Sequence, residues 1–89
     1  MKKIVVLGAG ESGTGAAILA KAKGMEVFVS DMGEIAPMYQ ALLDQHHIAW
    51  EAGKHTPSLI LDADEVIKSP GIPLTAPLVK QLMEQGTPI

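Results

Sequence analysis

The chain has 89 residues, 47% of them hydrophobic and 19% charged, so it has room for one α/β domain but no second catalytic module. Its net charge is -3 and its basic residues are all scattered lysines, which excludes a nucleic-acid-binding surface. It has no cysteine for a disulfide or a thiolate metal site, and no apolar run of membrane-spanning length. We therefore expect a cytoplasmic protein without a membrane partner.

The first third of the sequence predicts a strand, a helix and a second strand. Lys3–Leu7 is a β-branched, apolar run of the kind found in strands that are buried on both faces of a parallel sheet. A stretch rich in helix-forming residues follows from Ser12 to Lys23, with Gly24 where a left-handed helix end belongs. Met25–Asp31 is the second strand, so this segment predicts one βαβ unit.

The middle of the chain continues the alternation of helices and strands. A second helix has Pro37 in its first turn, ends near Gln45 or His46, and is predicted to have an apolar face made of Ile35, Met38, Leu42 and Leu43. His47–Glu51 is a short third strand and Glu65–Ser69 a fourth, with a brief helical turn at Pro57–Leu61 between them.

The last segment predicts one more helix and the start of another strand. Thr75 caps the helix, Pro77 lies in its first turn, Gly86 closes it, and its apolar side consists of Leu78, Val79, Leu82 and Met83. Thr87–Ile89 begins a fifth strand that the chain does not complete. The fold class is therefore α/β: a Rossmann-like parallel sheet with helices on both faces, in a single domain over residues 1–89 with its last strand truncated.

A glycine-rich loop, LGAGESGTG, stands between the first strand and the first helix. Gly8, Gly10 and Gly13 match the pattern G-x-G-x-x-G in the position that phosphate binding requires. The first glycine makes the tight turn, the second lets a phosphate approach the backbone, and the third lets helix and strand pack closely. The alternative is a glycine turn with a purely structural role.

Asp31 ends the second predicted strand. A dinucleotide-binding fold places there the acid that holds the adenosine ribose, although any nucleotide spread along the same strand ends would meet it. The alternative is that Asp31 only caps the turn that follows it.

The stretch KSPGIP, from Lys68 to Pro73, follows the fourth predicted strand. Pro70 and Pro73 fix the backbone, and Gly71 leaves its N–H approachable. Because ligands bind at the carboxyl edge of parallel sheets, this loop is expected to face the glycine loop. On composition alone it is also compatible with an ordinary turn.

No residues in the sequence predict catalysis or metal binding. His46 and His47 lie at the expected end of a helix, and His55 has no cysteine or carboxylate at ligand spacing. No nucleophile with an adjacent base can be assigned, and the phosphate-loop pattern G-x-x-x-x-G-K-[ST] is absent.

The glycine loop, Asp31 and KSPGIP, in this order and at these distances, resemble the amino-terminal domain of the Mur ligases of peptidoglycan synthesis. The resemblance extends from KIVVLGAGESGTGAA to PLVKQLMEQGTPI, which is nearly the whole chain. The branch of the family that it matches best adds D-glutamate to UDP-N-acetylmuramoyl-L-alanine. The resemblance implies a Rossmann-like domain that binds the UDP part of this substrate instead of NAD.

The family resemblance also implies roles for individual residues. The glycine loop, with Gly8, Gly10, Glu11, Ser12 and Gly13, would face the diphosphate. Asp31, Met32 and Gly33 would face the uracil end, and Ser69, Pro70 and Gly71 would form the other wall. The sequence departs from the family pattern at Met32 and Gly33, where relatives often have polar or cationic side chains. It also has Glu11, whose carboxylate would repel a diphosphate unless it points to solvent.

In the Mur ligases, ATP and magnesium bind in a central domain and D-glutamate in a third domain, both of which follow the segment seen here. The resemblance therefore implies that this chain holds no cofactor, acts with further ligase domains in cis, and is inactive alone. One alternative is the nucleotide-binding domain of an NAD(P)-dependent oxidoreductase, which has no need of KSPGIP. Another is a nucleotide-sensing domain, which the unfinished strand at Thr87–Ile89 does not favour.

Overall fold

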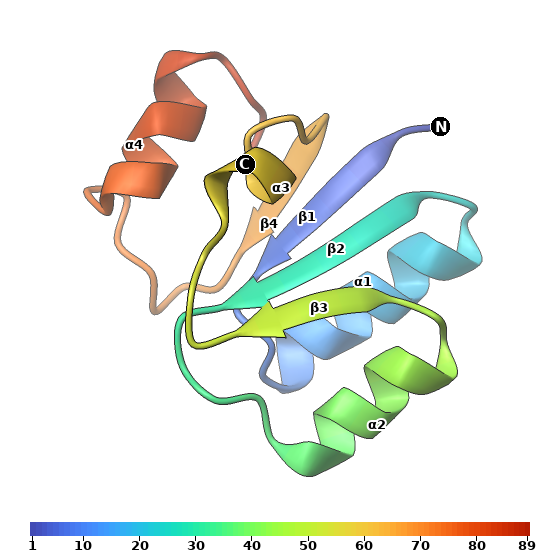
Figure 1. Ribbon diagram of the computed structural model, residues 1–89. Helices are drawn as coiled ribbons and strands as arrows, with labels where there is room; N and C mark the ends of the chain where they lie inside the picture. The colour runs from blue at the N-terminus through green and yellow to red at the C-terminus, as the bar shows by residue number, and fades with distance from the viewer.

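The computed structural model describes the whole chain from Met1 to Ile89. Its elements are β1 (Lys3–Leu7), α1 (Glu11–Ala22), β2 (Glu26–Asp31), α2 (Pro37–Gln45), β3 (Ala49–Ala52), α3 (Pro57–Ile60), β4 (Glu65–Lys68) and α4 (Pro77–Glu84). The strands form one parallel sheet in the order β3-β2-β1-β4, and their carboxyl ends all point to the lower left of Figure 1. The predicted parallel α/β fold is confirmed.

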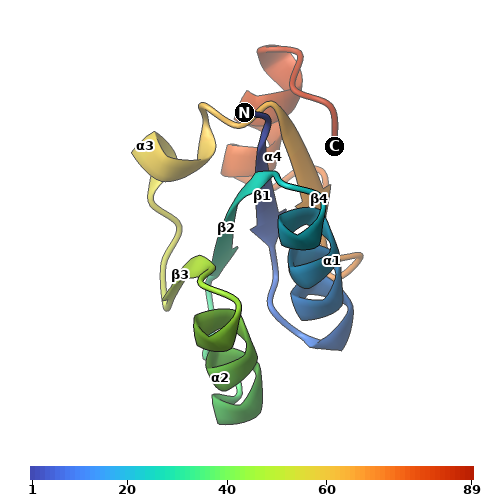
Figure 2. The same ribbon diagram turned by 90° about the vertical axis from the view of Figure 1, so that its right-hand side faces the viewer.

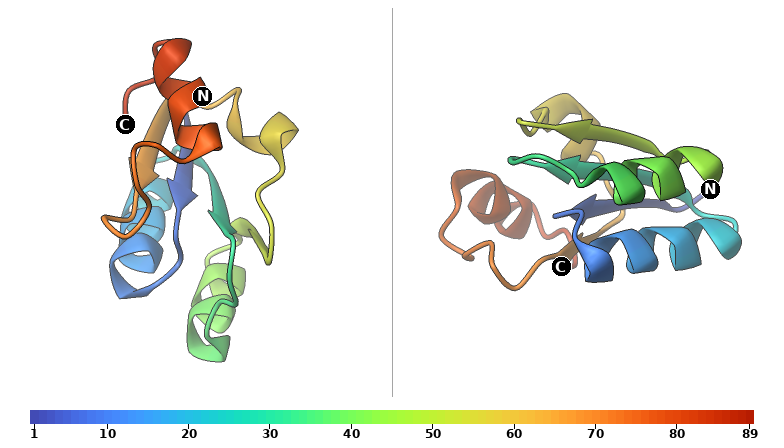
Figure 3. Two further views of the ribbon diagram at one scale, coloured as in Figure 1. Left: turned by 90° about the vertical axis from the view of Figure 1, so that its left-hand side faces the viewer. Right: turned by 90° about the horizontal axis from the view of Figure 1, so that it is seen from below.

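The sheet separates two apolar clusters. Side chains alternate between the faces of a strand, so Ile4 and Val6 of β1 enter one cluster while Val5 and Leu7 enter the other. The helices α1 and α2 cover the first cluster, and they lie next to each other in the right-hand view of Figure 3. The helices α3 and α4 cover the second cluster, and Figure 2 shows α1 and α3 on opposite sides of the sheet.

The first helix packs closely on the sheet because its buried side chains are small. Thr14, Ala17 and Ala20 are its buried residues, and short side chains let a helix backbone approach the strands. Gly24 follows the helix with a φ of +85°, the left-handed conformation that the sequence predicted for this position. None of the helices is long and apolar enough to cross a membrane.

The predicted apolar face of α2 is wrong in part. Leu43 is the only buried residue within the helix, whereas Met38 is 63% exposed and Leu42 is 37% exposed. Ile35 is buried, but it reaches the core from the loop before the helix. A helix that begins at Pro37 and rests against the sheet along a narrow stripe leaves its other apolar side chains in water.

The last helix, α4, differs from its prediction in its cap residue and in its apolar side. Its cap position is held by Ala76, and no side chain caps the helix, because Pro77 at the first helical position places Thr75 one residue too early. Val79 and Leu82 are buried as predicted, whereas Met83 is 50% exposed.

The third strand begins two residues later than predicted. His47 has a φ of +57°, and its N–H donates to the carbonyl oxygen of Asp44 in the turn that ends α2. A residue in the left-handed region cannot continue a strand, so β3 begins at Ala49.

The chain end lies along the outer edge of β4 without forming a regular strand. The N–H of Val66 donates to the carbonyl oxygen of Pro88 at 2.8 Å, a bond on the side of β4 that faces away from β1. This is the kind of contact by which a further strand would begin. No strand is assigned to Thr87–Ile89.

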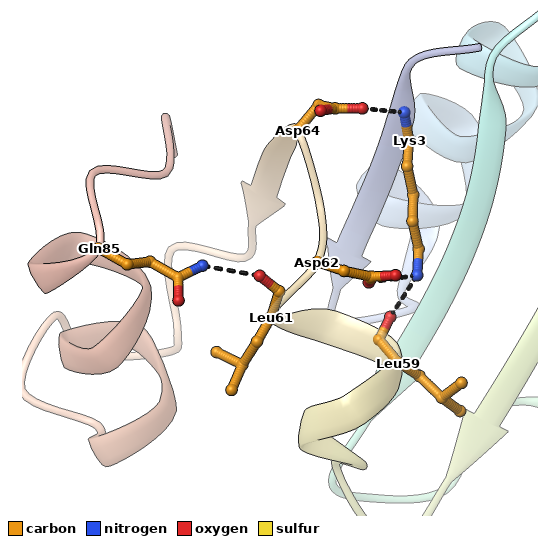
Figure 4. Close-up of polar contacts among 6 residues, drawn as sticks. All are labelled: Lys3, Leu59, Leu61, Asp62, Asp64 and Gln85. Carbon is orange, nitrogen blue, oxygen red and sulfur yellow. Dashed lines mark hydrogen bonds and ion pairs between the residues drawn. The ribbon is translucent and has the colours of Figure 1, made fainter.

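The amino end of the sheet is held by Lys3, which Figure 4 shows beside the segment that runs from α3 to β4. Its Nζ donates to Asp62 Oδ1 at 2.6 Å and to the carbonyl oxygen of Leu59 at 2.8 Å, and its backbone N–H donates to Asp64 Oδ2 at 2.7 Å. These bonds attach β1 to the connection between α3 and β4. They lie at the opposite end of the strands from the glycine loop and take no part in the candidate site.

Candidate functional site

The glycine loop connects β1 to α1 through two positions that only glycine suits. Gly8 has a φ of +100°, and its N–H donates to the carbonyl oxygen of Ser30 in β2. At Gly13, an added Cβ would lie 1.9 Å from the carbonyl oxygen of Gly8, far inside any real contact distance. The sequence predicted close packing of helix and strand at this third glycine, and the geometry confirms it.

The second glycine of the motif faces open space. A Cβ at Gly10 would meet nothing within 4 Å, and the first intrahelical bond of α1 runs from the Thr14 N–H to the Gly10 carbonyl oxygen. The N–H groups of Glu11, Ser12 and Gly13 have no acceptor within the chain. Three unpaired donors at a helix N-terminus, where the helix dipole is positive, form a favourable place for an anion.

Asp31 ties the glycine loop to the end of β2. Its Oδ2 accepts the Ala9 N–H at 2.8 Å, and its Oδ1 accepts the Gly33 N–H at 2.9 Å. The second bond is the turn-capping role that the sequence left as an alternative. The carbonyl oxygen of Gly33 accepts the N–H of Gly53, so both backbone groups of Gly33 are engaged within the chain.

The loop after β4 forms the opposite wall. Ser69 donates its N–H to the Leu7 carbonyl oxygen at 2.9 Å, and its Oγ accepts the Gly71 N–H at 3.3 Å. Lys68 Nζ donates to the carbonyl oxygens of Ser69 and Ile72, at 3.1 and 2.8 Å. This ammonium group therefore braces the KSPGIP turn and places a positive charge beside the glycine loop.

Two cavities meet at the glycine loop. The glycine cavity, of about 410 Å³, is lined by Val6, Leu7, Gly8, Gly10, Glu11, Ser12, Gly13, Ala16, Ile67, Lys68, Ser69 and Pro70. The Asp31 cavity, of about 330 Å³, is lined by Gly8, Ala9, Gly10, Asp31, Met32, His55, Ser69, Gly71, Ile72, Pro73 and Ala76. Gly8, Gly10 and Ser69 belong to both. The structure thus brings together every predicted site residue except Gly33, which lines neither cavity.

Sequence reasoning missed two polar residues at these cavities. Lys68 lines the glycine cavity, and its position inside the KSPGIP stretch was a signal that could have pointed to it. His55 lines the Asp31 cavity from the loop after β3. The local sequence around His55 gives no signal of this position, because His55 reaches the cavity only through the sheet order that places β3 beside β2.

A buried polar network supports the loop that carries His55. Glu51 is 9% exposed, and its carboxylate accepts hydrogen bonds from the Thr56 N–H, the Thr56 hydroxyl and the Ser30 hydroxyl. Burial acts to raise the pKa of Glu51, but the bonds from Thr56 and Ser30, with the nearby Lys54 charge, outweigh it and lower the pKa below its usual value. The carboxylate is therefore ionised at neutral pH. No group of three or more metal-binding side chains is present in the chain.

This network predicts an acid-sensitive contribution to stability. A carboxylate whose folded-state pKa is lowered stabilises the fold above the unfolded-state pKa of about 4.3, and that contribution is lost as pH falls through the folded-state value. Glu51→Gln should lower the free energy of unfolding by about 1–2 kcal/mol at pH 7. The difference from the unmodified chain should shrink below about pH 4 in urea unfolding experiments.

The matched control is Glu84→Gln, because Glu84 is exposed on α4 and makes no hydrogen bond through its side chain. Its unfolding curves should follow those of the unmodified chain at every pH. A Glu51→Gln variant that shows the same loss of stability at pH 3 as at pH 7 would contradict the assignment of an ionised carboxylate.

Comparison with known families and curated proteins gives a consistent result. The family model described as "Mur ligase MurD-like, N-terminal domain" matches residues 2–89. The UDP-N-acetylmuramoylalanine–D-glutamate ligase of Bacteroides thetaiotaomicron is 68% identical over 89 residues, covering 100% of this chain and 20% of the relative. The ligase of the same name from Christiangramia forsetii is 56% identical over 85 residues, covering 96% of this chain and 19% of the relative. The chain thus spans about a fifth of the length of these relatives.

A solved structure supports the fold. The crystal structure of UDP-N-acetylmuramate:L-alanyl-γ-D-glutamyl-meso-diaminopimelate ligase from Neisseria meningitides superposes with a TM-score of 0.80 at 23% sequence identity. The match covers 99% of this chain and 28% of that one. At this identity the likeness establishes the shared fold.

Proposed function

The chain belongs to the Mur ligase family as a MurD-like N-terminal domain, and on this premise we propose that it binds the uridine diphosphate part of a UDP-muramoyl substrate. The observation that carries the proposal is the set of unpaired N–H groups of Glu11, Ser12 and Gly13, which open into the glycine cavity. In a chain with a net charge of -3 and no arginine, backbone donors are the main source of attraction for a diphosphate.

The diphosphate would lie in the glycine cavity. The absence of a side chain at Gly10 leaves room for phosphate oxygens to reach the helix N-terminus, and Ser69 and Pro70 close the cavity on the far side. Lys68 adds a positive charge to that wall. Glu11 is exposed, which is compatible with a carboxylate that turns to solvent and avoids the phosphates.

The uracil end would lie in the Asp31 cavity. Asp31 and Met32 line it on one side and Gly71 on the other. Gly33 would serve by holding the turn through its hydrogen bond to Asp31 rather than by touching the base. The two cavities share Gly8, Gly10 and Ser69, so one nucleotide could extend through both of them.

The parent enzyme proposed here is an ATP-dependent ligase that adds D-glutamate to UDP-N-acetylmuramoyl-L-alanine. Its ATP and magnesium sites and its amino-acid site would belong to other domains in cis. The present domain would contribute by holding the nucleotide, which positions the muramoyl end of the substrate for a reaction elsewhere. ATP would transfer its γ-phosphoryl group to the carboxylate of the substrate and leave as ADP, and the amine of D-glutamate would then attack the acyl phosphate with release of inorganic phosphate.

A direct comparison of ligands tests this proposal. In calorimetric titrations of the purified chain, UDP-N-acetylmuramoyl-L-alanine should bind more tightly than NADH, with inorganic pyrophosphate as a control for general anion binding. The isolated domain contacts only one end of the substrate, so we expect a modest affinity. Tighter binding of NADH would favour the oxidoreductase alternative, and equal binding of pyrophosphate would mean that the base is not recognised.

A further inference from the structure

His55 is held against β2 by a buried serine. Ser30 is fully buried, and its Oγ lies 2.8 Å from Glu51 Oε2, 3.2 Å from the Lys54 carbonyl oxygen and 2.6 Å from His55 Nδ1. The serine hydroxyl has one hydrogen to share among these three neighbours. The arrangement therefore determines which ring nitrogen of His55 carries a proton.

Counting donors and acceptors indicates which tautomer fits this network. The carbonyl oxygen of Lys54 is only an acceptor, and so is the carboxylate of Glu51, which already receives both donors of Thr56. If Ser30 donated its hydrogen to His55, the serine oxygen would have only lone pairs to present to the oxygens of Glu51 and Lys54, and neither contact would be a hydrogen bond. When His55 Nδ1–H donates to Ser30 Oγ, the serine hydrogen is free to be donated to Glu51 or shared with the Lys54 carbonyl oxygen. In the neutral ring, Nε2 then carries the lone pair.

This nitrogen has no partner within the chain, and His55 lines the Asp31 cavity. Two other polar side chains line this cavity: Asp31 has both oxygens engaged by backbone N–H groups, and Ser69 Oγ accepts the Gly71 N–H. Met32, Ile72 and Pro73 add apolar surface to the same cavity. The cavity thus offers apolar walls suited to the faces of a flat ring, and His55 adds a ring nitrogen that has no partner within the chain.

We propose that Nε2 of His55 accepts a hydrogen bond from the ring N–H of a uracil base bound in the Asp31 cavity, and so selects uracil over cytosine. Uracil carries a hydrogen on N3, whereas N3 of cytosine is an acceptor and would meet His55 lone pair to lone pair. This inference rests on the proposed function, because it requires the uridine end of the ligand to occupy this cavity. It supplies the polar side-chain contact that Met32 and Gly33 do not provide.

Titrations with UDP and CDP test the inference, because the two ligands share the ribose and diphosphate and differ only in the base. His55→Asn places an amide nitrogen near the position of Nδ1, so it can still donate to Ser30, but it has no atom near Nε2. UDP affinity should fall roughly five- to tenfold in this variant, whereas CDP affinity should stay equal or rise, because the repulsion between the two lone pairs is removed. His55→Gln extends an amide oxygen toward the Nε2 position and should recover part of the preference for UDP.

A second readout is the protonation of the ring itself. Long-range proton–nitrogen NMR on the unmodified chain should show that the neutral form of the ring carries hydrogen on Nδ1 and none on Nε2, and UDP should shift the Nε2 resonance. Urea unfolding of both His55 variants confirms that they are folded before titration.

The outcomes separate this inference from the proposed function. If the chain binds UDP and His55→Asn retains the full preference over CDP, the role of His55 is overturned while diphosphate binding stands. A neutral ring protonated on Nε2 would also overturn it. If the unmodified chain binds no uridine nucleotide, both the proposed function and the inference fail.

Discussion

Gly13→Ala is expected to lower the free energy of unfolding by about 3 kcal/mol, because the new Cβ would lie 1.9 Å from the carbonyl oxygen of Gly8. That oxygen belongs to a backbone turn with a φ of +100° at Gly8, so it cannot move aside as a flexible side chain would. Relief of the clash requires α1 to shift away from β1, which opens the apolar cluster beneath the helix. Urea unfolding followed by circular dichroism measures the loss.

Gly15→Ala is the matched control, since Gly15 lies in the same helix two positions later, is exposed, and has nothing within 4 Å of an added Cβ. Alanine is the better helix former, so this variant should be more stable than the unmodified chain by about 0.5–1 kcal/mol. Equal effects of the two substitutions would contradict the claim that close packing of helix and strand sets the identity of residue 13.

Gly10→Val should weaken UDP binding by more than about 100-fold, because it removes access to several charge-assisted hydrogen bonds at once. Its side chain would fill the open space in front of the N–H groups of Glu11, Ser12 and Gly13. The backbone of Gly10 has a φ of -78° and a ψ of -162°, a conformation open to valine, so the fold should be retained. Calorimetry measures the affinity and thermal unfolding checks the fold.

Gly15→Val carries the same change outside both cavities and should bind UDP as the unmodified chain does. UDP binding that survives in Gly10→Val at nearly full strength would mean that the phosphates do not approach this loop. An unfolded Gly10→Val chain would contradict the observation that the position is free of contacts.

The fold was predictable from the sequence where local signals agreed with the tertiary structure. KIVVL predicted a doubly buried strand, and Val5 and Val6 do lie in different clusters on the two faces of the sheet. The limits of α1 and the glycine after it were also predicted to within one residue. Exposed Met38 and Met83 show where this reasoning fails, because helical periodicity does not reveal how wide a stripe the sheet will cover.

The candidate site was predictable in its loops but not in its long-range contacts. The glycine motif fixes its own geometry locally, through the turn at Gly8 and the close approach at Gly13. Asp31 was recognised as a strand-end acid, yet its bond to Ala9 depends on the pairing of β1 with β2. The position of His55 depends on a third strand, because its hydrogen bond to Ser30 forms only when β3 pairs with β2.

The most direct test of diphosphate binding at the glycine loop is a titration of the ¹⁵N-labelled chain with UDP, followed by NMR. The N–H groups of Glu11, Ser12 and Gly13 should show the largest changes in chemical shift, with further changes at Asp31, Ser69 and Gly71. Their lack of partners in the free chain makes them sensitive to any acceptor that arrives. Changes confined to other parts of the molecule, such as the exposed side of α4, or no change at saturating UDP, would contradict the proposal.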